Sequence, residues 1–146
     1  MVVEIISVGT ELLMGNIVNT NAQHIAQKLA NMGLDAYYQT VVGDNPERLR
    51  AALDVAYTRG DCVITTGGLG PTKDDLTKEM LISYFGCTPV EDEEALRRLE
   101  ERAAKRGVPL SESMRKQATV PSGAMVLQND HGTAPGVIIE KDGRVC

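Results

Sequence analysis

Three glycines follow a short apolar run in the middle of the chain. Residues 61–66, Asp-Cys-Val-Ile-Thr-Thr, have an apolar centre and continue directly into Gly-Gly-Leu-Gly-Pro at 67–71. Glycines after a strand let the backbone approach a ligand closely, and a helix that starts behind them offers N–H groups and a positive dipole end. The spacing favours a phosphate-binding loop, although a tight turn is the alternative for any single glycine. The segment is not a Walker A loop, because Gly-Lys-Ser/Thr is missing, and it does not match G-x-G-x-x-G at the last glycine.

Acidic side chains stand close to this loop. Asp74 and Asp75 follow the glycines, and Asp44 follows an earlier apolar run at 35–42. Acids at the start of a helix complement its dipole, which is the simpler interpretation of the pair. Carboxylates beside a phosphate can also hold Mg²⁺, which binds through few carboxylates together with substrate phosphates. Both interpretations stay open for Asp74 and Asp75, and Asp44 is a further candidate to hold the cation.

Other polar residues are weaker candidates. Lys73 can neutralise a phosphate or point into water. Glu11 lies in the first loop and can accept hydrogen bonds from a ribose or a pterin, although acids are common in loops. Gly132 and Thr133 belong to a second glycine-containing segment, which forms either a turn or another backbone N–H surface.

Several classes of chemistry are disfavoured. Three cysteines with no C-x-x-C spacing indicate neither a disulfide framework nor a zinc site, and no Ser/His/Asp order or G-x-S-x-G motif is present. A net charge of −5 argues against nucleic acid or a membrane surface as the main partner. Because the N-terminus also lacks a basic region and a long apolar stretch, we expect a cytoplasmic protein.

Apolar periodicity indicates the elements that position these residues. The expected strands are 2–8, 35–42 and 61–66. The expected helices are 20–32, one that opens at Pro46 and ends before Gly60, and about 74–85. Thr20 and Gln23 suggest a capping box at the first helix, and Asn45 with Pro46 opens the second. Alternation of strands and helices predicts a parallel sheet with right-handed crossovers, whose ligands gather at the carboxyl ends of the strands.

The second half of the chain is less regular. Residues 91–106 predict a helix with a charged outer face, 111–117 a short helix, and 124–127 and 136–140 two strands. No flexible linker separates these parts, so we expect residues 1–146 to form one domain. The last residues, 134–146, have the pattern of a hairpin whose second arm stops early, and we expect the domain to be truncated at this edge.

Motifs spread over nearly the whole chain carry a resemblance to a known family. They are VGTELLMGNIVNTNAQHIAQKL, QTVVGDNPERL, TTGGLGPTKDDLTKE, RKQATVP and GTAPG. In these motifs the chain resembles the N-terminal domain of the CinA (competence/damage-inducible) family, which is similar to the molybdopterin-binding domains of MogA, MoaB, MoeA and gephyrin. The resemblance implies a three-layer α/β/α fold whose mixed sheet is parallel except for one edge strand.

The resemblance also implies an activity and a set of site residues. CinA-type domains look like ADP-ribose pyrophosphatases, in which a metal assists the attack of water on a diphosphate. The acids that match the active site are Asp44 and Asp75, with Mg²⁺ or another divalent cation between them and Lys73 offsetting charge. The expected ligand contacts are Glu11, Thr66, Gly67, Gly68, Gly70, Pro71, Thr72, Asp74, Thr77, Gly132 and Thr133.

Two other functions remain open at this point. One is a module that binds or adenylylates molybdopterin in molybdenum cofactor metabolism, and the other is a non-catalytic assembly domain, since relatives of this fold are commonly homo-oligomers. Family members also continue into an L-P-G-x-P-x-E-M segment and often an amidase domain, both absent from this sequence. We therefore expect weak or no activity from these residues alone and carry no deamidation over to them.

Overall fold

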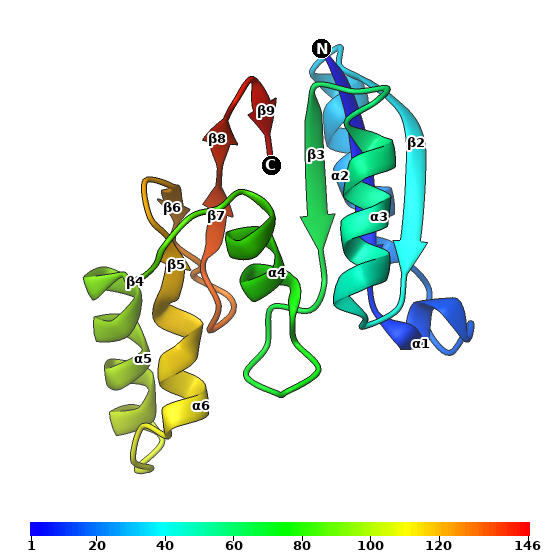
Figure 1. Ribbon diagram of the computed structural model, residues 1–146. Coiled ribbons are helices and arrows are strands. Elements are labelled where there is room, and N and C mark those ends of the chain that lie inside the picture. Colours follow the sequence, from blue (N-terminus) through cyan, green and yellow to red (C-terminus); the bar gives the residue numbers. More distant parts are fainter. The chain divides into compact units, whose positions relative to one another are not determined.

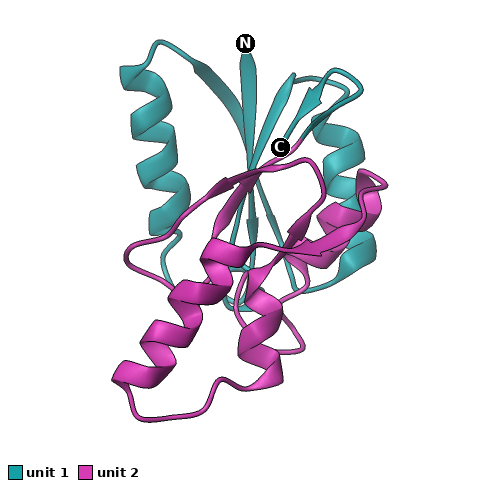
Figure 2. Cartoon of the chain, turned by 90° about the vertical axis from the view of Figure 1, so that its left-hand side faces the viewer, with its two compact units in different colours: residues 1–68, 140–146 teal, residues 69–139 magenta.

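The structure is a computed structural model that describes all residues, 1–146. The chain forms two compact units (Figure 2). Unit 1 comprises residues 1–68 and 140–146, and unit 2 comprises residues 69–139. None of the helices combines the length and the apolar composition that crossing a bilayer would require.

Unit 1 is built on a five-stranded sheet with the order β2-β1-β3-β9-β8 (Figure 1). Its elements are β1 (Val2–Val8), α1 (Thr10–Leu13), α2 (Thr20–Asn31), β2 (Asp35–Val42), α3 (Pro46–Ala56), β3 (Cys62–Thr66), β8 (Glu140–Lys141) and β9 (Arg144–Val145). All neighbouring strands pair in parallel except β8, which is antiparallel to β9 at the edge. The expected mostly parallel sheet with one antiparallel edge strand is confirmed.

Strand β1 lies between two helical layers. Six of its seven residues are buried, as expected for a strand covered on both faces. Val3 and Ile5 pack against Ala22 and Leu29 of α2. Figure 2 shows one helix of unit 1 on either side of the sheet, which gives this unit its α/β/α layering.

An ion pair joins the buried Glu4 of β1 to Arg59, which lies in the connection between α3 and β3. Glu4 of β1 is only 1% exposed, and its carboxylate accepts hydrogen bonds from Arg59 Nε at 2.8 Å and Nη2 at 2.7 Å. Thr40 donates a further bond at 2.7 Å, and the guanidinium lies 3.9 Å from the centroid of the Tyr38 ring. Burial alone would raise the pKa of Glu4, but the hydrogen bonds from Arg59 and Thr40 hold it below its ordinary value.

The ends of the helices in unit 1 mostly follow the expected capping chemistry. Asn45 accepts a bond from Arg48 N at 2.9 Å and is followed by Pro46, as predicted. The predicted box at Thr20 is wrong by one residue, because Asn19 caps α2 by accepting a bond from Ala22 N at 3.2 Å. An asparagine carbonyl reaches the third helical N–H as well as a threonine hydroxyl does, so either assignment satisfies the sequence pattern.

Unit 2 combines four helical segments with two short pairs of antiparallel strands. Its elements are α4 (Thr77–Tyr84), β4 (Pro89–Glu91), α5 (Glu93–Lys105), α6 (Glu112–Arg115), the 3₁₀ turn η1 (Lys116–Ala118), β5 (Thr119–Pro121), β6 (Met125–Leu127) and β7 (Gly136–Ile138). β4 pairs with β5 and β6 with β7, both antiparallel. Ala95 and Leu99 of α5 pack with Ala118, which confirms that this helix is scaffold with a charged outer face.

Lys78 is an unusual buried residue of unit 2. It is 8% exposed, and its Nζ donates to the backbone carbonyls of Gln117 at 2.6 Å and Thr119 at 2.8 Å. Burial lowers the pKa of Lys78 to about 8 from the ordinary 10.5. The lysine therefore links α4 to β5 through these hydrogen bonds, although removing its ammonium group from water is unfavourable.

Stability should depend on pH through this lysine. Because the unfolded chain binds more protons than the folded chain between about pH 8 and 10.5, the penalty for charging Lys78 is full below this range and fades within it. Relative to Lys78→Met, the wild type should gain up to about 3 kcal/mol of unfolding free energy as pH rises through the range. Urea unfolding of both proteins at several pH values measures the difference, and a pH-independent difference would contradict the assigned burial.

Candidate functional site

A pocket of about 100 Å³ opens in unit 1 at the carboxyl ends of β1 and β3. Figure 1 shows α1 at this end of the unit, beyond the arrowheads of the strands. The lining residues are Val8, Glu11, Leu12, Ile17, Val18, Asn19, Thr20, Asn21, Thr66 and Gly67. Three predicted contact residues, Glu11, Thr66 and Gly67, are thus brought together where a parallel sheet is expected to hold its ligand.

Gly67 is fixed by its backbone geometry. It has a φ of +94°, and a β-carbon placed there would overlap the carbonyl oxygen of Val8 at the end of β1. Gly68 follows with a φ of +62°. Only glycine combines a left-handed backbone with so close an approach between two strands, so at Gly67 the loop geometry itself demands the residue type.

Two asparagines of the pocket escaped the sequence analysis. Asn21 donates from Nδ2 to the hydroxyl of Thr66 at 3.1 Å, and Asn19 donates from Nδ2 to the hydroxyl of Ser7 at 2.9 Å. Both belong to the start of α2, where polar residues are expected as caps or surface groups. Their sequence signal was the Asn-Thr-Asn run directly after the first loop.

Asp44 joins the loop after β2 to the loop after β1. Its Oδ2 accepts from Thr10 N at 2.9 Å and from Thr10 Oγ1 at 2.8 Å, while Asp44 N donates to Thr10 Oγ1 at 3.2 Å. One carboxylate oxygen is therefore engaged in positioning α1. The other carboxylate oxygen carries neither of these bonds, which fits a group that could hold a cation from one side.

Asp75 has a matching arrangement in unit 2. Its Oδ2 accepts from Thr72 N at 2.9 Å and Thr72 Oγ1 at 2.5 Å, and its carboxylate lies against Gly70. Burial would raise the pKa of Asp75, but the hydrogen bonds from the Thr72 hydroxyl and from the Gly70 and Thr72 backbones hold it below its ordinary value. The group is ionised at neutral pH, as a ligand of a cation must be.

This hydrogen-bonded turn also corrects the predicted start of the helix. Helix α4 begins at Thr77, not at Asp74, and no side chain caps it. Because Thr72 and Asp75 close their own turn, Asp74 and Asp75 lie ahead of the first helical turn and do not act as its N-terminal acids. Thr77 is fully buried, whereas Pro71, Thr72, Lys73 and Asp74 are exposed.

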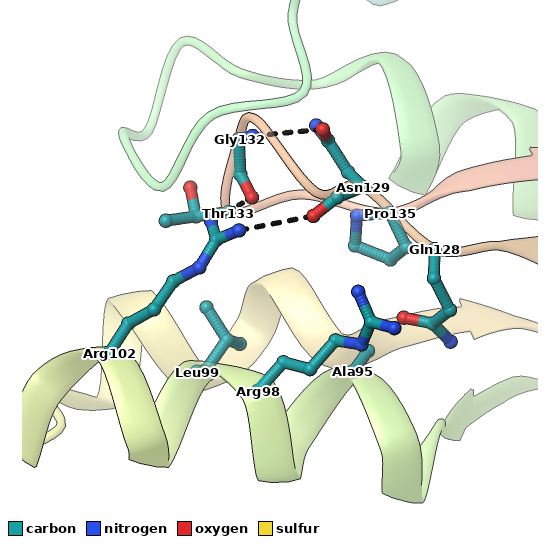
Figure 3. A pocket seen from close by; sticks show the side chains of 9 residues that line it. All are labelled: Ala95, Arg98, Leu99, Arg102, Gln128, Asn129, Gly132, Thr133 and Pro135. Carbon is teal, nitrogen blue, oxygen red and sulfur yellow. Dashed lines mark hydrogen bonds between the residues drawn. The ribbon is translucent and has the colours of Figure 1, made fainter.

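The segment with Gly132 and Thr133 lies against α5 in unit 2 (Figure 3). Gly132 N donates to Asn129 Oδ1 at 2.8 Å, and Arg102 donates to the carbonyls of Gly132 and Asn129. The cavity beside these residues measures about 10 Å³, which is room for a single water. Because the Gly132 N–H already donates to Asn129, it is not available to a ligand. These contacts favour the interpretation of this segment as a turn over that of a ligand-binding surface.

The acidic residues could hold a metal only together with a ligand. Asp44 belongs to unit 1 and Asp75 to unit 2, and the structure contains no group of three or more His, Cys, Asp or Glu side chains arranged to hold a metal ion. Mg²⁺ bound by one or two carboxylates completes its shell with phosphate oxygens and water. Each carboxylate, taken within its own unit, is therefore compatible with a cation whose other oxygens come from a ligand and from water.

Residues 4–145 match the sequence family described as a probable molybdopterin binding domain. The chain belongs to this family. CinA from Thermoplasma acidophilum is similar in structure, with a TM-score of 0.87 and 35% identity over 99% of this chain and 84% of that one. MoaB from Pyrococcus furiosus, a tungsten cofactor synthesizing protein, shares the fold with a TM-score of 0.57 and 20% identity over 93% of this chain and 78% of that one.

Sequence relatives of this chain are longer proteins. A protein of Caldicellulosiruptor bescii with a competence-damage inducible name is 59% identical over 100% of this chain, which spans 36% of the relative. A CinA-like protein of Dictyoglomus turgidum is 53% identical over 97% of this chain and 34% of its own length. The chain therefore spans about a third of these relatives, and the resemblance to CinA is confirmed.

Proposed function

We propose that this domain binds a nucleotide diphosphate such as ADP-ribose and, with a divalent cation, hydrolyses its diphosphate bond. The observation that carries the proposal is the pocket at the ends of β1 and β3, which closes on Thr66 and Gly67. Gly67 and Gly68 both have positive φ and carry no side chain, so the backbone of this loop can approach a ligand closely. A pocket next to such a loop suits a ligand with both a polar ring and phosphates.

In the proposed reaction, the acidic side chains and Lys73 have different roles. Asp44 and Asp75 supply carboxylates, and each is oriented by a threonine through two hydrogen bonds. A bound divalent cation would offset the phosphate charge and lower the pKa of water. Lys73 is exposed, so its ammonium group is free to lie beside the departing phosphate. Water adds to one phosphorus as the bridging P–O bond breaks, giving AMP and ribose 5-phosphate, and the released protons pass to solvent.

Binding of a molybdopterin is the second candidate. The family carries this ligand in its description, and the pocket presents carboxylate and amide oxygens that suit the N–H groups of a pterin. This alternative uses the same residues without requiring hydrolysis. It predicts that the protein purifies with a fluorescent pterin from cells that make the cofactor. Self-association and a cytoplasmic location stay predictions in either case.

Asparagine substitutions test the assigned acids. Asp44→Asn and Asp75→Asn each keep an acceptor for the threonine bonds but lose the charge, so ADP-ribose hydrolysis with Mg²⁺ should fall at least about a hundredfold. Asp142→Asn is the matched control, because Asp142 is an exposed acid in the turn between β8 and β9 and has no role in the site, and it should stay within about twofold of the wild type. Release of AMP measures turnover, and calorimetry measures affinity. Unchanged turnover in Asp75→Asn would refute its role.

A further inference from the structure

The charge of the unit 1 pocket is unlike that of a phosphate site. Its lining contains one charged side chain, the Glu11 carboxylate, and no lysine, arginine or histidine. Glu11 is exposed and its carboxylate lies over Gly9, so the charge stays at the pocket and is not cancelled by an ion pair. A carboxylate beside a phosphate is repulsive unless a cation separates them.

The helix end that faces the pocket is partly closed to an anion. Asn19 Oδ1 accepts from Ala22 N at 3.2 Å, and Val18 O accepts from Thr20 N at 2.9 Å. An open helix N-terminus would offer both of these N–H groups to a phosphate. Two N–H groups of the first turn of α2 are therefore engaged by the chain itself.

The remaining lining has an apolar side and an acceptor side. Leu12, Ile17 and Val18 line one part of the pocket, and Ile17 and Val18 are 53% and 79% exposed. Glu11 adds carboxylate oxygens, while Asn21 holds the Thr66 hydroxyl with one N–H of its amide. The volume of about 100 Å³ is several times the roughly 10–15 Å³ that a cavity needs to hold one water, so a small ring fits better than a lone solvent molecule.

We infer that this pocket binds the sugar part of the ligand, an uncharged ring with two adjacent hydroxyls, and that it excludes phosphate. Glu11 accepts hydrogen bonds from both hydroxyls, and the C–H face of the ring covers Ile17 and Val18. The inference rests on the proposed function for the identity of the ligand, with the phosphates bound outside the pocket. Glu11 is thus a specificity-determining residue that distinguishes the sugar end from the phosphate end.

Free D-ribose tests this assignment without any phosphate or metal. In ¹⁵N–¹H spectra of the chain, tens of millimolar D-ribose should shift the amides of Val18, Asn21 and Thr66. Glu11→Gln removes the charge but little volume, and should weaken ribose binding about tenfold. Glu140→Gln removes an exposed charge on β8 and should leave binding unchanged. Spectra that overlay elsewhere verify that Glu11→Gln is folded.

Two outcomes would overturn the assignment. One is the absence of ribose-induced shifts in the wild type, and the other is a stronger response of the same amides to inorganic phosphate than to ribose. Loss of ribose binding in Glu11→Gln together with an unchanged response to phosphate supports it. Because no diphosphate is used, ribose binding without ADP-ribose hydrolysis would refute the proposed activity and leave the sugar pocket standing.

Discussion

Gly67→Ala is expected to lower the free energy of unfolding by about 2–5 kcal/mol, because it combines a disfavoured backbone with a steric overlap. The φ of +94° is strained for alanine, and the new methyl group would meet the backbone carbonyl of Val8. Val8 ends the central strand and is itself buried. Neither the Val8 carbonyl nor the backbone at residue 67 can therefore move without disturbing the packing of the central strand.

Gly33→Ala is the matched control for this substitution. Gly33 ends α2 with a φ of +71°, but a β-carbon there has no neighbour within 4 Å. It should cost only the backbone strain, about 1 kcal/mol. Urea unfolding of the three proteins gives both values. Equal losses for Gly67→Ala and Gly33→Ala would show that β1 and the glycine loop are not in close contact.

Arg59→Met should destabilise the protein clearly more than the loss of an exposed ion pair does, because it leaves the buried Glu4 carboxylate without its cation. Methionine keeps the length of the apolar stem, so the change reports mainly on the lost charge. Arg97→Met is the control, since Arg97 pairs with Glu94 on the surface of α5, and exposed pairs contribute about 1 kcal/mol or less. A loss at Arg59 no larger than at Arg97 would contradict the buried pair.

The same pair fixes the sign of a pH effect. The folded pKa of Glu4 lies below the ordinary 4.5, so its stabilising contribution is complete above pH 4.5 and is lost as pH falls through the folded pKa. The difference in unfolding free energy between the wild type and Arg59→Met should therefore shrink below about pH 4.5. Unfolding curves at pH 7, 4 and 3 measure it, and a constant difference would argue against an ionised Glu4.

Unit 1 was largely predictable because its signals are local. The strands at 2–8 and 35–42 have the bounds that apolar runs and glycine stops suggested. Asn45 and Pro46 open α3 as expected, because a cap and a fixed φ act within one helical turn. The antiparallel edge strand was expected from the family resemblance, since two-residue strands such as β8 carry almost no pattern of their own.

Other features depended on contacts that the sequence pattern does not reveal. The start of α4 was misplaced because Asp75 bonds Thr72 and not the helix. The ion pair between Glu4 and Arg59 joins residues 55 positions apart, and β1 was expected to be buried without any partner for its acid. Division into two units was likewise hidden, since no linker-like composition marks residue 68.

Sequence patterns indicated several residues that line the pocket, but they did not reveal the hydrogen bonds that these loops form. Glu11, Thr66 and Gly67 were expected to contact a ligand and do line one pocket. The hydrogen bonds that Asp44 and Asp75 form with threonines were not foreseen, because they depend on loop conformation. Asn21 was missed for the same reason, since a polar residue in the first helical turn looks like a surface group until the fold places it against Thr66.

The thermal unfolding midpoint with and without ligand tests the central claim most directly. The chain would be heated with ADP-ribose, with AMP, with ribose 5-phosphate and in buffer alone, each with and without Mg²⁺. Ligands that bind only the folded state raise the midpoint, and the rise increases with the logarithm of the ligand concentration relative to Kd. We expect the largest rise with ADP-ribose and Mg²⁺ together. No rise with any of these ligands would contradict a nucleotide diphosphate site and favour the pterin alternative.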